Sequence, residues 1–423
     1  MNSTKLYPFY IFFIFSFIYA LGSFDRIPFG DCVGFVSTTD KGEFVKTSTP
    51  VDHFLYINTA IFIKAITGFN GILASKLLVI ISASLSVVIV YFTSLLTTKK
   101  HWVAIVSAFV FGFSFTFWRN AEIVEVYTYH TFWCALIFYF IIKTFLHEKK
   151  KKKNIIFAGL LLAISLWSHI ENILLIPAFF VFLLIFRKHK TALYLGIIFL
   201  IISILGMTLL NAQQNLPFKS IYSTGQGKWV ENSFKKSLAE YFTDLIKSVF
   251  ILIYNFNIFV IPGVLGCIYL FKSNKPLFYV AFVAGFFIYG FSTFYAVSDN
   301  YVFFLPFNLL FIIAIALGLS NSKMESLFKK WSPLCLLIPV FYLMSFQVIS
   351  MTSFGKNIDD FKSYKGGLRY YALPWMNDNV GILEFTIEKR KALEPMGWMT
   401  LTAEEYIRLL KTRGYTEQEI KEF

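Results

Sequence analysis

The feature that most constrains this chain is a series of apolar runs, each long enough to cross a lipid bilayer. A transmembrane helix needs about 20 predominantly apolar residues, and a soluble domain has no use for many such runs. We therefore predict an all-α polytopic membrane protein with about eleven spans. The runs lie near residues 6–23, 74–97, 102–118, 126–146, 154–168, 170–186, 191–210, 246–271, 277–297, 301–319 and 333–351.

The net charge of +14 would suggest a nucleic-acid partner in a soluble protein. Here 57% of the residues are hydrophobic, and the basic residues gather in short loops between the apolar runs. That distribution is the positive-inside pattern of a membrane protein. We expect a lipid bilayer as the surrounding phase and no nucleic-acid partner.

The basic loops predict the orientation of the chain. They hold Lys99 and Lys100, the lysines at 149–153, Arg187 to Lys190, Lys272 with Lys275, and Lys323 with Lys329 and Lys330. All of them face the cytoplasm only if the apolar segment 50–66 lies along the outer surface as an interfacial helix. The N-terminus is then cytoplasmic and the C-terminus outside.

Three hydrophilic segments face outward in this topology: 24–73, 211–245 and 352–423. We divide the chain into a transmembrane domain, 1–351, and an extracytoplasmic C-terminal region, 352–423. Within that region we expect a helix at 402–412, and the stretch "GGLRYYALPW" is a candidate for acceptor binding because of its position.

Polar clusters recur at the outer turns. The first outer loop carries five acids, Asp25, Asp31, Asp40, Glu43 and Asp52. Three further turns are polar. The first carries Arg119, Glu122, Glu125, Tyr127 and His130; the second carries His169 and Glu171; the third carries Asp299. Charged groups near membrane depth are costly and usually line an internal cavity, although a structural ion pair between Arg119 and Glu122 or Glu125 would also explain two of them. A helix through this stretch would put Glu122, Glu125 and Tyr129 on one face.

The four cysteines show no disulfide or zinc-site spacing. We assign no metal ligands and no certain cofactor, while a divalent cation held by the acids stays open.

The stretches "GDCVGF", "WRNAEIVEVYTYHTF", "SLWSHIENILLIPAF" and "FYAVSDNYVFFLPFNL" occur in an order that resembles the transmembrane protein O-mannosyltransferase family. That family belongs to the GT-C glycosyltransferase superfamily and has many bacterial members. The resemblance covers roughly residues 1–320. It departs from the family pattern at Gly34 and Thr49, where the family has a glutamate and a histidine, and this leaves the choice of active-site acid open.

The resemblance implies an inverting transfer of a sugar, with mannose the expected one, from a polyprenyl-phosphate donor to a hydroxyl acceptor. The acceptor would be Ser or Thr of an exported protein, or a glycan, at the periplasmic face of the bacterial cytoplasmic membrane. Asp31 would act as the general base. Arg119 would stabilise the leaving phosphate, with Arg26 and Lys228 as further candidates. The donor pocket would be lined by Glu125, Tyr127, His130, His169 and Asp299.

The main alternative is a transporter or flippase of a lipid-linked or small polar substrate. Such a protein is expected to show inverted repeats and charges near the bilayer midplane. The charges here lie at outer turns, and we find no repeat. A structural membrane subunit would not need polar clusters at several turns of one side. We therefore favour the transferase.

Overall fold

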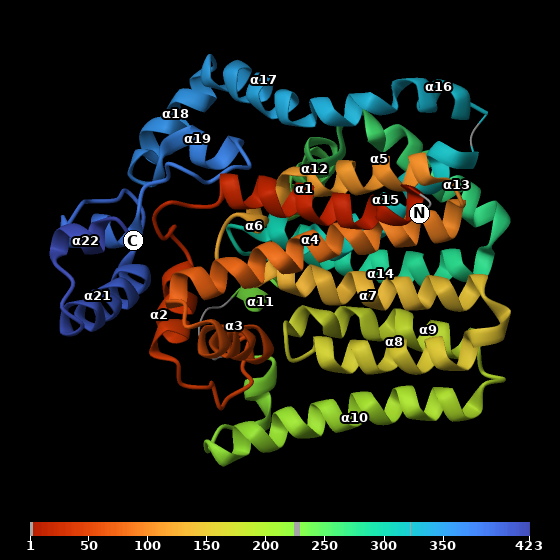
Figure 1. The fold of residues 1–423 in the computed structure, drawn as a ribbon, viewed down its shortest axis with the longest axis horizontal. Coiled ribbons are helices and arrows are strands. Elements are labelled where there is room, and N and C mark those ends of the chain that lie inside the picture. The colour runs from red at the N-terminus through yellow and green to blue at the C-terminus, as the bar shows by residue number, and fades with distance from the viewer. Residues whose placement is uncertain (1–2, 224–228, 322) are drawn as a thin grey trace.

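The computed structural model describes residues 3–223, 229–321 and 323–423. Every regular element in these ranges is a helix, so the predicted all-α class is confirmed. Most of the longer helices run side by side in one bundle (Figure 1). They are α1 (Tyr7–Gly22), α4 (Gly71–Thr98), α5 (His101–Gly112), α7 (Tyr127–Leu146), α8 (Lys151–Ser165), α9 (Ile176–Ile185), α10 (Lys190–Gln213), α12 (Leu238–Phe256), α13 (Val260–Ser273), α14 (Lys275–Phe294), α15 (Leu305–Asn321) and α17 (Ile338–Ser350).

Each expected apolar run corresponds to helix. Among the described residues, eight helical segments are long and apolar enough to cross a membrane, and a ninth is a bent pair. The long segments include α12 joined to α13 and α16 (Glu325–Trp331) joined to α17. The runs at 154–168 and 170–186 form α8 and a short helix with α9, which are below spanning length by that criterion. The count of eleven spans therefore stays a prediction.

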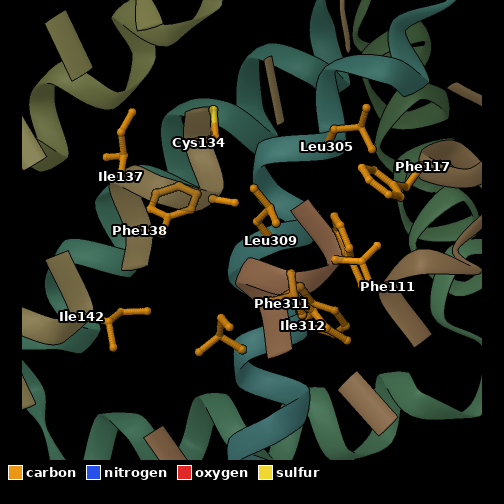
Figure 2. Close-up of a cluster of buried hydrophobic side chains, with 14 of the residues drawn as sticks. Phe111, Phe117, Cys134, Ile137, Phe138, Ile142, Leu305, Leu309, Phe311 and Ile312 are labelled. Atoms are coloured by element: carbon orange, nitrogen blue, oxygen red, sulfur yellow. The ribbon is translucent and has the colours of Figure 1, made fainter. Parts of the chain in front are cut away.

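Helix α15 lies at the centre of the bundle. Of its most apolar stretch 78% of the residues are buried, against 22% for α1 and α10, whose outer faces carry many exposed apolar side chains. Figure 2 shows Leu305, Leu309 and Ile312 of α15 between phenylalanines from one side and Ile137 and Phe138 of α7 from the other. Exposed apolar faces as large as those of α1 and α10 are consistent with contact with lipid.

Helices α13 and α15 approach each other most closely at two glycines. A Cβ atom on Gly266 would lie 1.7 Å from the Ala314 carbonyl oxygen, and one on Gly318 would lie 1.8 Å from that of Pro262. Small residues allow such close backbone contact between membrane helices.

Alanine at Gly266 is therefore expected to lower the free energy of unfolding by roughly 1–3 kcal/mol, as overpacking does in a filled core. Thermal unfolding in detergent measures it. Gly290→Ala on α14 is the control, because a Cβ there meets nothing within 4 Å. Equal stability of the two variants would contradict the close crossing.

One expected span is broken. Helix α5 ends at Gly112, and α6 (Phe115–Ala121) leaves at an angle of 68°. The break is supported by Asn255 of α12, whose side-chain oxygen accepts from the Thr116 backbone N–H at 2.8 Å. Our expectation that Arg119 lies in a turn is wrong: it is in the last turn of α6. The single helix that would align Glu122 with Glu125 is also wrong, because α6 ends before Glu122.

The first outer loop and the C-terminal region pack together at one end of the bundle, opposite the N-terminus (Figure 1). The loop forms α2 (Cys32–Lys41) and α3 (Phe54–Thr67). They share a second apolar core with residues of the C-terminal region. The C-terminal helices are α18 (Ser353–Phe361), α19 (Gly367–Ala372), α20 (Ile382–Ile387), α21 (Gly397–Thr412) and α22 (Glu417–Lys421), and α11 (Trp229–Phe234) lies nearby in the chain's other outer segment.

Direct hydrogen bonds fasten the C-terminal region to the bundle. The backbone N–H of Met376 donates both to the Gly22 carbonyl at 2.9 Å and to Glu122 Oε2 at 3.0 Å. Ile382 N–H donates to the Ile27 carbonyl at 2.9 Å. The expected helix at 402–412 lies within α21. The boundary at 351 stays a prediction, although these contacts show that the region following it packs against the first outer loop.

Candidate active site

The structure brings Asp31 to the start of α2, at the same end of the bundle as the C-terminal region. Its side chain makes no capping bond with the helix and is open to solvent. Protein nevertheless surrounds it, and this burial, with the charge of Asp299, raises the pKa of the carboxyl group to about 6. An acid that is both accessible and surrounded by protein lies in a recess. Desolvation there disfavours the ionised form, so the carboxylate binds a proton more strongly than that of a surface aspartate.

Glu125 and Asp299 complete a group of three acids with Asp31. Glu125 lies between α6 and α7, and its Oε1 accepts from Cys32 Sγ at 3.5 Å, next to Asp31 in the chain. Burial, followed by the charges of Asp31 and Asp299, raises the pKa of Glu125 well above its usual value. Burial also raises the pKa of Asp299, which precedes a short helix leading into α15. Three segments distant in sequence thus bring their acids within electrostatic reach of one another.

Gly30 allows the loop to approach Glu125. Its φ of +112° is in the region that side chains disfavour. A Cβ atom there would also lie 3.4 Å from Glu125 Oε1. The glycine before Asp31 therefore has a conformational reason to be there, while a Cβ would make only an ordinary van der Waals contact with Glu125.

Arg119 shares two electrostatic neighbours, Tyr301 and Lys365, with Asp299. Its side chain is almost completely buried, with 3% of the residue exposed. The guanidinium lies over the Tyr370 ring at 4.5 Å, farther from Tyr371 at 5.9 Å, and donates to the Tyr370 carbonyl oxygen. Tyr301 faces it from the segment before α15. The Nε atom is buried and has no hydrogen-bond partner.

The alternative that Arg119 is half of a structural ion pair does not hold among the described residues, where no carboxylate forms an ion pair with it. Glu122 instead accepts from Trp118 Nε1 at 2.6 Å and from the Met376 backbone. An arginine whose buried Nε–H has no partner and whose guanidinium forms no ion pair is suited to bind an anion from outside.

Sequence reasoning missed Lys365 and the contact of Tyr370 and Tyr371 with Arg119; all three residues come from the C-terminal region. Burial, the first cause, and the charges of Lys362 and Arg119 lower the pKa of Lys365 to about 8. The shared electrostatic neighbours, Arg119 and Asp299, place this lysine at the same site. The "GGLRYYALPW" stretch was singled out for acceptor binding, and it holds both tyrosines; only the pairing with Arg119 required the fold.

Tyr127 begins α7 and lies within electrostatic reach of all three acids. Its ring is 5.9 Å from that of His169. His169 in turn stacks on His130 at 4.7 Å and on His53 at 5.1 Å. His130 and His169 are both buried, and they form a cluster with Glu171, whose charge also reaches Tyr127.

The other candidates have different surroundings. Arg26 pairs with Glu384 at 2.9 Å and with Glu422, both in the C-terminal region. Lys228 lies outside the described residues. Of the remaining loop acids, Asp40 is buried and accepts from Gly71 N–H at 2.9 Å and from Arg413, and Asp52 accepts from Thr49. Asp31 is therefore the acid of this loop that meets Glu125 and Asp299.

An apolar cavity of about 580 Å³ opens between the helices on another side of α15. Side chains of α7, α9, α13, α14 and α15 line it, from Leu146 and Asn274 near the basic loops to Tyr289 and Phe307 near the start of α15. Its lining is almost entirely apolar, which is suited to a hydrocarbon chain.

The arrangement defines a class of protein. The helical membrane bundle has an ArnT-like GT-C fold, which two solved structures share. ArnT from Cupriavidus metallidurans in the apo state matches with a TM-score of 0.62 and 11% identity, covering 96% of this chain and 75% of that one. The same protein bound to undecaprenyl phosphate matches with a TM-score of 0.60 and 11% identity, covering 95% and 75%.

Residues 44–193 match the family model described as the protein O-mannosyl-transferase TMEM260 N-terminal domain. The resemblance found in the sequence is thereby confirmed over residues 44–193, and the solved structures show that the chain as a whole shares the ArnT fold. The matched range contains Arg119, Glu125 and His169 and begins after Asp31. A search of curated proteins gave no match.

Proposed function

We propose that this enzyme transfers a sugar, mannose by its family resemblance, from a polyprenyl-phosphate donor to a hydroxyl group. The acceptor is Ser or Thr of an exported protein, and transfer takes place on the extracytoplasmic side. Two observations carry the proposal: Asp31 is an accessible acid, and Arg119 has a buried Nε–H without a partner. Asp299 links them, because its charge acts on Asp31 and also on Tyr301 and Lys365, which are neighbours of Arg119. A base and a phosphate-binding group are what this transfer requires.

In the proposed reaction the acceptor oxygen attacks the anomeric carbon and its proton passes to Asp31. The bond between that carbon and the phosphate oxygen breaks, and the phosphate leaves with the electron pair. Arg119 stabilises the negative charge with its free Nε–H and its guanidinium charge. Because Asp31 has a raised pKa, it accepts the proton more readily than an ordinary aspartate.

The remaining residues position the reactants. Glu125 holds the Asp31 loop in place through Cys32, and with Tyr127 and Asp299 it offers hydrogen-bonding groups to the sugar. His169 packs against the Tyr127 ring, and His130 stacks on His169. The apolar cavity beside α15 accommodates part of the polyprenyl chain, whose phosphate then lies toward Tyr301 and Arg119. The solved relative that binds undecaprenyl phosphate supports a donor of this class.

Transfer of radiolabelled sugar from polyprenyl-phosphate donors, in liposomes containing the purified protein, tests the proposal. Product should form with at least one such donor and not with a nucleotide sugar alone. Absence of transfer from every polyprenyl-phosphate sugar, by folded protein with peptide and glycan acceptors present, would contradict it.

The pH profile should identify the base. Asp31 accepts a proton only when ionised, so kcat/KM should fall about tenfold per pH unit below a midpoint near pH 6 and level off above it. Since the charge of Asp299 raises the pKa of Asp31, Asp299→Asn should move this midpoint to lower pH. A flat profile between about pH 5 and 8, or an unmoved midpoint in the variant, would exclude Asp31 as the titrating base.

A further inference from the structure

The buried cluster of His130, His169 and Glu171 has the composition of a metal site. It consists of His130 in the first turn of α7, His169 in the turn after α8, and Glu171 in the short helix Ile170–Leu175. All three residues are buried, with 1%, 7% and 5% of their surfaces exposed. One ligand atom from each lies within 4.8 Å of the others, and both histidine Nδ1 atoms are 3.7 Å from Glu171 Oε2.

The hydrogen bonds around His130 fix the direction of its lone pair. Asn172 donates through Nδ2 to the Ser165 carbonyl oxygen, so its own oxygen faces His130 Nε2 at 3.0 Å. Nε2 must therefore carry the hydrogen, and in a neutral ring the lone pair is on Nδ1, toward Glu171. A metal-binding histidine has such a partner on its second nitrogen in most proteins.

His169 and Glu171 add further acceptors to the same point. His169 Nδ1 accepts the Glu171 backbone N–H at 3.2 Å, so this nitrogen also bears a lone pair, and a metal ion bound there would take the place of that N–H. Both carboxylate oxygens of Glu171 are buried without a hydrogen-bond partner. The unpartnered Glu171 carboxylate thus faces two ring nitrogens that bear lone pairs, an arrangement that is costly inside a protein unless a cation lies there.

We propose that His130, His169 and Glu171 bind a divalent transition-metal ion of the zinc class. Two imidazole nitrogens and one carboxylate oxygen are a zinc donor set, whereas Mg²⁺ and Ca²⁺ take oxygen ligands. Bonds of about 2.0–2.1 Å place the ligand atoms of a tetrahedral zinc roughly 3.3 Å apart. The two 3.7 Å nitrogen–oxygen separations need only a small contraction, and all three ligand atoms lie within 4.8 Å of one another before any ion is bound. Three protein ligands leave the fourth position to water.

The ion would join α7 to the turn after α8. His130 is three residues beyond Tyr127, and the Tyr127 ring is 5.9 Å from that of His169. Fixing both histidines therefore fixes the wall of the active site on which Tyr127 lies. This role is one of positioning, and it does not depend on which sugar or acceptor the enzyme uses.

Metal content of the purified protein tests the proposal without any measurement of transfer. Protein stripped with a chelator and then dialysed against buffer containing zinc should retain about one zinc per chain by elemental analysis. Glu171→Gln and His130→Ala should each retain less than a tenth of that amount. His147→Ala, which changes an exposed histidine just beyond α7, is the matched control and should bind as the unmodified protein does.

Two further measurements, the unfolding temperature and the absorption spectrum with Co²⁺, distinguish loss of the metal site from loss of the fold. Zinc should raise the unfolding temperature of the unmodified protein and of His147→Ala but not that of Glu171→Gln. Co²⁺ in place of zinc should give the visible absorption of a tetrahedral site. Zinc retention by Glu171→Gln equal to that of the unmodified protein, or no retention by the folded unmodified protein, would overturn the proposal.

Discussion

Asp31→Asn should reduce sugar transfer by roughly 10²–10⁴-fold, the range that a general base contributes. The side chain keeps its size and loses only the ability to accept a proton. The fall should be in kcat, with a small change in the KM for the donor, because Asp31 acts on the acceptor hydroxyl. Transfer of radiolabelled sugar in liposomes measures both parameters.

The same substitution should not unfold the protein. The pKa of Asp31 is about 6 in the folded chain and lower in an unfolded one, so ionising this group at neutral pH opposes folding. Asparagine removes that cost, and the unfolding temperature should be unchanged or higher. Glu43→Gln, an exposed acid in the same loop, is the control and should keep full activity. Full activity in Asp31→Asn would remove Asp31 from the mechanism.

Arg119→Gln should lower kcat/KM for the polyprenyl-phosphate donor by about 10–100-fold, since a hydrogen bond to a charged group contributes roughly 1.5–3 kcal/mol. Arg119→Lys should recover only part of this loss. An ammonium group restores the charge, but it cannot both lie over the Tyr370 ring and donate through Nε, as the planar guanidinium does.

Arg369 provides the control for Arg119. Arg369→Gln changes an exposed arginine of α19, next to Tyr370, and should leave kcat/KM unchanged. Binding of undecaprenyl phosphate to each variant, measured by its effect on the unfolding temperature, separates donor affinity from chemistry. Equal donor affinity and kcat/KM in Arg119→Gln and Arg369→Gln would contradict a phosphate-binding role.

The fold was largely predictable because membrane helices are specified by the length of their apolar runs. Each run became helix, and the acids of the first loop met the turns carrying Glu125 and Asp299. The break in the run 102–118 was not predictable from hydropathy, because it depends on Asn255, a residue more than 130 positions away that satisfies the start of α6.

The candidate site was predictable only in part, because some of its residues are brought together by packing between segments that are distant in sequence. Asp31, Arg119 and Glu125 stand out in sequence as charges beside apolar runs. Lys365, Tyr370 and Tyr371 do not, because their polar surroundings look like an ordinary outer segment until the C-terminal region packs against Arg119. The histidine–glutamate cluster likewise has no close sequence spacing between His130 and His169, and only folding brings their nitrogen atoms to Glu171.

The central claim is that Asp31 and Arg119 belong to one donor site at the end of the bundle where the C-terminal region packs. An experimental structure of the protein with undecaprenyl phosphate tests this most directly. The account predicts phosphate oxygens within hydrogen-bonding distance, about 2.7–3.2 Å, of Arg119 Nε, with the phosphate on the side of Asp31. Phosphate bound at the opposite end, among the basic loops, would contradict it.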